Sequence, residues 1–278
     1  KGVALHALSA IDLALWDLAG KAAGKPVYEL LGGPVKPDIP VYASALHPVG
    51  AEKVQAEAKA YVEEGYQAMK MRFPYGPGHG IAGMRANEEH VANVRDAVGD
   101  DIEIMADAYM GWDFLYAKKM VKRLEPYRLA WLEEAFLPDD LNSYAKLRQE
   151  TSIPISGGEH EYTRFGFQQI IEKQAMDIIQ PDLRRCGGLS EGRRICSLAL
   201  ANGITVIPHA YGPTHIHFAL AETAVPMIEY FPIPSWDDLP DAEVEPIFHD
   251  EPQPQNGRVT ASTKPGLGVT VNERIFAD

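Results

Sequence analysis

Short apolar runs with the alternation of β-strands follow one another along most of the chain, and longer stretches with helical spacing separate them. Eight runs predict strands, at residues 41–45, 67–72, 102–108, 130–134, 154–159, 177–181, 205–209 and 227–231. Seven stretches between them predict helices, at residues 51–64, 86–98, 116–124, 142–151, 164–174, 190–202 and 214–223. Because parallel strands need helical crossovers, this order predicts an α/β protein with a modified TIM-like (β/α)7β barrel. A doubly wound open sheet is the alternative.

The pattern changes before and after this alternating region. Residues 1–38 carry apolar residues at helical spacing and predict a helical lead-in, whereas residues 39–232 hold the barrel. Beyond Pro232, repeated prolines and the Asn256–Gly257 pair predict loops and a hairpin over residues 233–278. The chain begins within a helical pattern and not at a methionine, so we expect it to be part of a longer chain.

Composition narrows the classes of function. Among 278 residues there are 26 Lys and Arg against 39 Asp and Glu, a formal net charge of −13 without a basic run, so nucleic acid is not an expected partner. The two cysteines, Cys186 and Cys196, match no zinc signature and are expected to be unpaired in a reducing cytoplasm. Neither a membrane-spanning run nor a secretory signal is evident, so we expect a cytoplasmic protein without a membrane partner.

Three consecutive predicted strands end in acidic residues. Asp107, Glu133 and Glu159 follow one another at a constant interval of 26 residues. Barrel active sites are built at the carboxyl ends of strands, so these carboxylates are expected at one height around the mouth of the barrel. Each acid alone would be an ordinary loop or capping residue, but three in register predict a Mg²⁺ site with oxygen ligands. Glu134 is expected to face outward, because successive strand residues alternate in direction.

The next three strands end in groups suited to proton transfer. Asp182 follows the sixth strand, His209 the seventh, and Glu229 lies in the eighth. A carboxylate beside an imidazole fixes its tautomer and raises its basicity, as a general base near neutral pH requires. Asp182 and His209 are therefore predicted to form a dyad, although either residue alone would more often be structural.

Several stretches together are similar to the enolase superfamily and, within it, to the mandelate racemase subgroup. The resemblance extends over essentially the whole chain, in SAIDLALWDLAGKAAGKPVYELLGG, IMADAYMGWD, WLEEAFLPDD, SGGEHEYTRFGF, DIIQPDLRRCGG, VIPHA and IEYF. The segments KMRFPYGP, LPDD and GEHE most resemble the acid sugar dehydratases related to L-rhamnonate dehydratase. The resemblance implies a barrel of eight strands and seven helices together with a capping domain. The N-terminal part of that domain would be absent from this chain, and residues 233–278 would pack on it.

The resemblance also implies a role for each candidate residue. Asp107, Glu133 and Glu159 match Mg²⁺ ligands, and Glu229 matches an acid that faces the enolised carboxylate. The Asp182–His209 pair matches a base that removes the proton α to a carboxylate. Loss of the 3-hydroxyl would then turn a sugar acid into a 2-keto-3-deoxy acid. The alternatives are a racemase, epimerase or cycloisomerase of the same superfamily, or a catalytically silent relative.

The sequence departs from the family pattern on the second strand. Many relatives carry Lys-x-Lys there, whereas this chain has Lys70-Met71-Arg72. Arginine is always protonated, so Arg72 is a poor base and a better charge partner for substrate, which weakens the racemase alternative. Lys70 and His160 are further candidates for substrate contact. The expected partners are a small sugar acid and, as in many relatives, further copies of the same chain.

Overall fold

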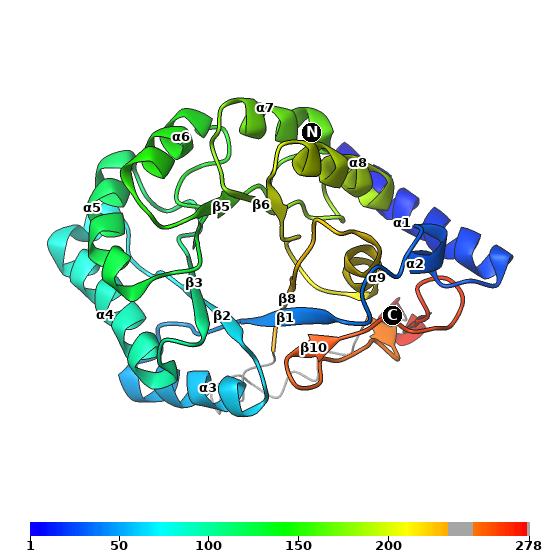
Figure 1. Cartoon of the computed structure of the whole chain (residues 1–278), viewed down its shortest axis with the longest axis horizontal. Coiled ribbons are helices and arrows are strands. Elements are labelled where there is room, and N and C mark those ends of the chain that lie inside the picture. Colours follow the sequence, from blue (N-terminus) through cyan, green and yellow to red (C-terminus); the bar gives the residue numbers. More distant parts are fainter. Residues whose placement is uncertain (233–246, 277–278) are drawn as a thin grey trace.

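The computed structural model describes residues 1–232 and 247–276, and its centre is a parallel sheet surrounded by helices (Figure 1). The strands are β1 (Ile39–Ser44), β2 (Ala68–Arg72), β3 (Glu103–Asp107), β4 (Leu132–Glu133), β5 (Ile155–Gly157), β6 (Ile178–Ile179), β7 (Thr205–Val206) and β8 (Ile228–Tyr230). They pair in the order β8-β1-β2-β3-β4-β5-β6-β7, all in parallel. The order never reverses, as it would in a doubly wound sheet, so the predicted α/β fold with a barrel-like sheet is confirmed.

One helix follows each of the first seven strands, as the periodicity predicts. These helices are α3 (Ala51–Glu63), α4 (Gly80–Val98), α5 (Phe114–Leu124), α6 (Leu141–Glu150), α7 (Thr163–Glu172), α8 (Gly188–Ala201) and α9 (Pro213–Ala221). Short 3-10 turns, η1 (Pro77–His79), η2 (Glu125–Tyr127) and η3 (Glu273–Phe276), add to them. Several strands are shorter than predicted, because their apolar runs continue into the loops at the carboxyl ends. Those loops carry the candidate site.

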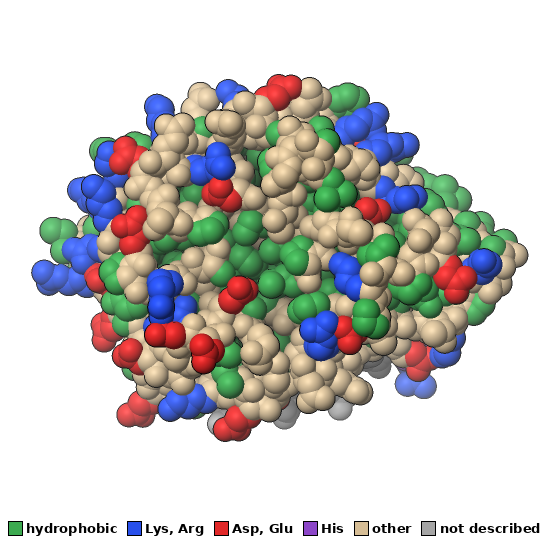
Figure 2. Space-filling model, in the orientation of Figure 1, with side chains coloured by type: hydrophobic (Ala, Val, Ile, Leu, Met, Phe, Trp, Pro, Cys, Tyr) green, Lys and Arg blue, Asp and Glu red, His purple; other side chains and the backbone are tan. Residues whose placement is uncertain are grey.

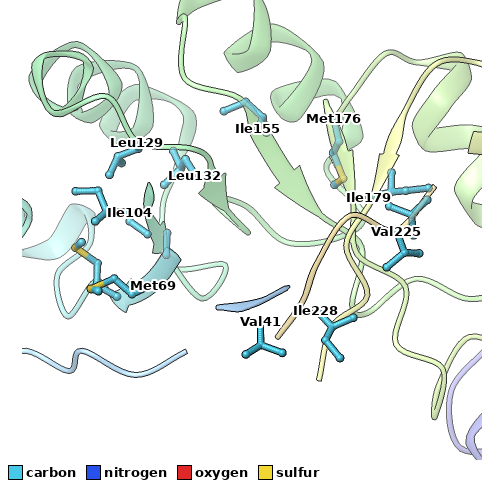
Figure 3. Close-up of a cluster of buried hydrophobic side chains, with 14 of the residues drawn as sticks. Val41, Met69, Ile104, Leu129, Leu132, Ile155, Met176, Ile179, Val225 and Ile228 are labelled. Atoms are coloured by element: carbon cyan, nitrogen blue, oxygen red, sulfur yellow. The ribbon is translucent and has the colours of Figure 1, made fainter. Parts of the chain in front are cut away.

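Side chains alternate between two sides of each strand, and each side has its own role. Outward residues such as Val41, Met69 and Ile104 pack against the helices and form the main core (Figure 3). Inward residues form a smaller apolar cluster of Tyr42, Ala68, Met105, Trp131 and Ile207. The inward positions two residues further along these strands are polar: Ser44, Lys70, Asp107, Glu133 and His209. An apolar floor therefore lies beneath a polar mouth.

The lead-in consists of α1 (Val3–Ala23) and α2 (Val27–Leu30), and α1 lies against α8. Trp16 donates its indole N–H to Ser190 Oγ at 3.0 Å, and Asp12 accepts from the Ser190 backbone at 3.0 Å. The opposite side of α1 exposes a stripe of Leu8, Ile11, Leu15 and Leu18. By length and composition alone this helix also qualifies as a membrane span, so the expected absence of a membrane partner stays a prediction.

The C-terminal segment returns to the lead-in and to the barrel. The strand β10 (Arg258–Val259) adds to β1 in antiparallel register, after the predicted Asn256–Gly257 turn. A second ladder joins β9 (Phe248–His249) to β11 (Thr270–Val271). Leu267 N donates to Asp17 Oδ1 on α1 at 2.7 Å. The predicted segment 233–278 lies partly outside the described residues, at 233–246 and 277–278, and its expected packing on a capping domain stays a prediction.

Charged side chains gather around the rim of the face shown in Figure 2, whereas its centre is largely apolar. Both cysteines are buried and free, as predicted.

Candidate active site

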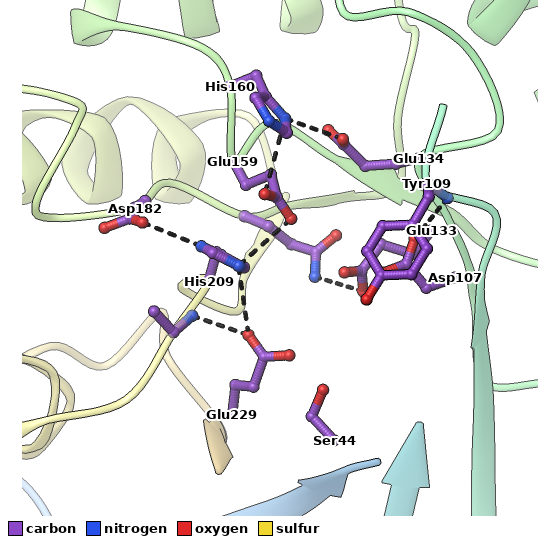
Figure 4. Close-up of polar contacts among 12 residues, drawn as sticks. Ser44, Asp107, Tyr109, Glu133, Glu134, Glu159, His160, Asp182, His209 and Glu229 are labelled. Carbon is purple, nitrogen blue, oxygen red and sulfur yellow. Dashed lines mark hydrogen bonds and ion pairs between the residues drawn. The ribbon is translucent and has the colours of Figure 1, made fainter. Parts of the chain in front are cut away.

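The carboxyl ends of β3 to β8 bring all six of the predicted acidic and imidazole groups to the mouth of the barrel (Figure 4). Their burial is unusual for charged groups. Asp107, Glu133, Asp182 and Glu229 are at most 3% exposed, and the side chains of Glu159 and His209 are 14% exposed. Buried charges need partners, so the contacts of each carboxylate define what this site can hold.

Asp107, at the end of β3, is held by a neighbouring arginine and by its own loop. Arg72 Nη1 donates to Asp107 Oδ2 at 3.1 Å, and the Tyr109 backbone N–H donates to Oδ1 at 2.8 Å. Burial and the negative charge of Glu133 raise the pKa of Asp107 to about 7, against the opposing effect of Lys70 and Arg72. A further positive charge here would keep the carboxylate ionised.

Glu133, at the end of β4, accepts from three side chains. Lys70 binds Oε1, while Trp131 Nε1 and Gln180 Nε2 donate to Oε2 at 2.9 and 2.8 Å. An ionised carboxylate offers about four lone-pair positions, so about one of them remains free. Glu133 is thus held in a fixed orientation and still has capacity for one more ligand.

Two cations from β2 neutralise part of this negative charge. Lys70 Nζ contacts both Glu133 and, at 2.9 Å, Glu229 Oε1, and the lysine is 1% exposed. Burial alone would lower the pKa of Lys70, but the two carboxylates raise it well above its usual value, so the amine stays charged. Arg72 donates to Ser44 Oγ at 2.8 Å and lies 5.1 Å from the Tyr109 ring centre. Neither side chain is free to act as a base.

Glu134 corrects the expectation that it faces outward. The residue is 2% exposed, and its Oε2 lies 3.0 Å from His160 Nδ1. The strand ends at Glu133, and Glu134 has a φ of 41°, so strand alternation no longer sets its direction. His160, which sequence alone placed neither inward nor outward, faces both Glu134 and, at 3.7 Å, Glu159.

Three ligand atoms within 4.8 Å of one another belong, among the described residues, to Glu134, Glu159 and His160. The predicted trio of Asp107, Glu133 and Glu159 does not form such a compact group, and Lys70 and Arg72 contact two of its members. All three nevertheless keep acceptor positions, and their hard oxygen donors are those that Mg²⁺ prefers. The carboxylates of the mouth also outnumber the permanent cations that contact them, which are Lys70, Arg72, Arg184 and Arg185. The residues present therefore fit a divalent cation.

The predicted dyad forms on the other side of the mouth. His209 Nδ1 lies 3.0 Å from Asp182 Oδ2, which leaves Nε2 directed toward Glu159 at 3.4 Å and Glu229 at 3.9 Å. Burial alone would lower the pKa of His209, but the hydrogen bond with Asp182 and the charges of Glu229 and Glu159 raise it. The contact with Asp182 fixes the tautomer whose Nε2 accepts a proton.

Two further residues connect the parts of the site, and sequence reasoning missed them. Arg185 contacts Glu159 Oε1 at 3.1 Å and Asp182 Oδ2 at 3.3 Å, so it joins the two sides of the mouth. Gln180 reaches Glu133 from the segment that follows β6. One signal in the sequence could have identified Gln180. It lies two residues before Asp182, and alternate residues of a strand point to the same side, so a side chain directed into the barrel could be expected there.

Family comparisons agree with this geometry. A model described as "Enolase C-terminal domain-like" matches residues 53–275, and one for the mandelate racemase / muconate lactonizing enzyme N-terminal domain matches residues 2–32. The chain belongs to the enolase superfamily. Within it, the two matches place the chain in the mandelate racemase / muconate lactonizing enzyme group, as the sequence motifs predicted.

Several enolase superfamily relatives have named activities. An L-rhamnonate dehydratase of Saccharopolyspora erythraea is 38% identical over 99% of this chain and 68% of its own length. The crystal structure of L-rhamnonate dehydratase from Gibberella zeae has a TM-score of 0.84 and 35% identity, over 99% of this chain and 68% of that one. A racemase from Streptomyces coelicolor, solved with bound magnesium, has a TM-score of 0.86 and 28% identity, over 99% and 72%. The predicted class, an enzyme with hydro-lyase relatives, is confirmed.

Proposed function

We propose that this protein dehydrates a sugar acid in a Mg²⁺-dependent reaction that gives a 2-keto-3-deoxy acid. The observation that carries the proposal is the Asp182–His209 dyad, whose free Nε2 lies 3.4 Å from Glu159, one of the three carboxylates assigned to the metal. A base beside a cation site is the arrangement that proton abstraction α to a carboxylate requires. The dehydratase relatives at 38% and 35% identity support the same reaction.

The three carboxylates on β3, β4 and the loop after β5 would hold the metal: Asp107, Glu133 and Glu159. When bound, Mg²⁺ supplies positive charge that offsets the charge developing on the substrate carboxylate. The permanently charged Lys70 and Arg72, held at one side of the mouth by Glu133, Glu229 and Asp107, add to this positive field. They bind and orient the acid and transfer no proton.

Proton transfer falls to His209. Its Nε2 takes the C2 proton, and the electron pair of that C–H bond is first delocalised onto the substrate carboxylate and then forms the C2–C3 double bond as the C3–O bond breaks. The protonated imidazole returns the proton to the departing hydroxyl, which leaves as water, and the enol product tautomerises to the 2-keto acid. Burial alone would raise the pKa of Asp182, but the hydrogen bond with His209 and the charges of His215 and Arg184 together lower it, so Asp182 remains ionised throughout.

A racemase or epimerase is the second candidate, because the Streptomyces coelicolor structure is that of a racemase. Inversion of a carbon in both directions needs a second base on the face opposite His209. Lys70 is bound by two carboxylates and Arg72 by Asp107, so neither is available as a neutral base. This arrangement favours dehydration.

A panel of C5 and C6 aldonic acids, L-rhamnonate included, tests the proposal. The protein is incubated with Mg²⁺, and formation of a 2-keto-3-deoxy acid is measured, with EDTA and His209→Asn as controls. We expect product with at least one acid, dependent on both the metal and His209. Inversion of C2 without keto product would support the racemase instead, and product formation in EDTA would refute the metal assignment.

A further inference from the structure

Gln180 lies between the two sides of the mouth and has no role in the reaction described so far. It follows β6 directly, two residues before Asp182 of the dyad, and is 1% exposed. Burial of a glutamine costs free energy unless its amide forms hydrogen bonds. Its neighbours therefore indicate what it does.

The amide N–H₂ of Gln180 faces a candidate metal ligand on another strand. Nε2 donates to Glu133 Oε2 at 2.8 Å, and the indole N–H of Trp131 donates to the same oxygen at 2.9 Å. The opposite orientation of the amide would place its carbonyl oxygen against a carboxylate oxygen, so the chemistry fixes this one. Two donors on Oε2 and Lys70 on Oε1 leave the carboxylate little freedom to rotate.

The other end of the same amide has no donor. Gln180 Oε1 is buried and has no hydrogen-bond partner among the described residues. A buried carbonyl oxygen is unfavourable without a donor, and a metal-bound water or a hydroxyl group of a sugar acid provides one.

We propose that Gln180 is a positioning residue, which holds Glu133 in its metal-binding orientation through Nε2 and accepts an O–H group of the bound ligand at Oε1. The proposal rests on the proposed function, in which Glu133 binds Mg²⁺. Partners that hydrogen-bond to metal-binding carboxylates set both orientation and affinity. Gln180 thereby couples the metal side of the mouth to the segment after β6 that carries Asp182.

Calorimetric titration with Mg²⁺ alone tests the first half. Gln180→Met keeps the volume of the side chain but removes both hydrogen-bonding groups, and we expect the Mg²⁺ Kd to rise about tenfold. The matched control is Asn87→Leu. Asn87 is also fully buried, its Oδ1 also lacks a partner among the described residues, but its amide donates to the Tyr75 carbonyl at 2.9 Å. We expect that variant to lower Tm and to leave the Mg²⁺ Kd unchanged.

A Gln180→Met Kd within twofold of the parent value would overturn the proposal, as would equal losses in both variants. Trp131→Phe provides a second measurement, because it removes the other donor to Oε2. Both donors share one oxygen. We therefore expect the fold-change in Mg²⁺ Kd of the double variant, Gln180→Met with Trp131→Phe, to differ from the product of the two single fold-changes. Independent effects would overturn the shared positioning role.

The second half is measured at saturating Mg²⁺ with L-rhamnonate. We expect Gln180→Met to raise KM in addition to any change in kcat, because a hydroxyl contact is lost, and an unchanged KM would overturn the Oε1 role. If the parent protein binds Mg²⁺ but dehydrates no acid, the proposed function fails. The metal titration then still decides whether Gln180 positions Glu133.

Discussion

The two sides of the barrel mouth handle negative charge differently. On the metal side, Asp107 and Glu133 contact cations from β2 and keep free acceptor positions. On the proton-transfer side, Asp182 already contacts His209, Arg184 and Arg185, and Glu229 accepts from the Ala210 backbone N–H at 2.8 Å. The difference indicates that one side is built to take up a further positive charge, whereas the other is built to hold and move one proton.

Replacement of the base gives the largest expected effect. A general base contributes about 10²- to 10⁴-fold, so His209→Asn should lower kcat by about 10³-fold while the Mg²⁺ Kd stays within about twofold. Turnover assays and calorimetry on the same preparation measure both values. If metal affinity fell together with kcat, the two sides of the mouth would not be separate in function.

Lys70→Met tests how far the metal side depends on a buried cation. Removal of one partner of a buried ion pair costs about 3–5 kcal/mol, so the free energy of unfolding should fall by that amount without metal. Mg²⁺ should restore part of the loss, since it supplies charge to the same carboxylates. Urea unfolding with and without Mg²⁺ measures both effects.

Lys36→Met is the matched control for Lys70→Met. Lys36 is less buried than Lys70, and its amine binds the backbone carbonyls of Glu222 and Val225. Its removal leaves no buried carboxylate without a partner. We expect a smaller loss of stability and no extra recovery with Mg²⁺, and equal behaviour of the two variants would contradict the charge argument.

Two adjacent glutamates distinguish the predicted metal site from the compact group around His160. Glu133→Gln should raise the Mg²⁺ Kd by about 100-fold, because it removes a ligand charge, whereas Glu134→Gln should change it far less. Calorimetric titration of both variants gives the comparison. The reverse order of effects would assign the ion to Glu134, Glu159 and His160 instead.

The pH profile gives the smallest expected change. His209 must be neutral to accept a proton, and its raised pKa places the rising limb of kcat/KM above the usual imidazole value of about 6.5. Asp182→Asn removes the interaction that favours the imidazolium, so the pKa of His209 should fall. The rising limb of the residual activity should then move to lower pH. A limb that does not move in that direction would exclude Asp182 as the cause of the raised pKa.

Much of the fold and of the site could be predicted from local pattern. The helices and strands follow from periodicity, and the ends of the predicted strands located Asp107, Glu133 and Glu159 at the mouth of the barrel, although Glu159 lies in the loop after β5. The Asp182–His209 contact also followed, since neighbouring parallel strands end at the same edge. Glu134 was misplaced because the strand stops one residue before it, and that end depends on tertiary contacts.

The sequence by itself determined the order of strands and helices, the separation of core from polar positions, and the residues available for acid–base chemistry. The helices, the strands and their buried faces follow from the period of apolar and polar residues, which can be recognised from the sequence alone. Only the tertiary structure decided that Lys70 joins Glu133 to Glu229, that Arg185 connects Glu159 to Asp182, and that Gln180 reaches Glu133. Those contacts cross between strands far apart in sequence, and they depend on side-chain lengths and rotamers inside a packed barrel.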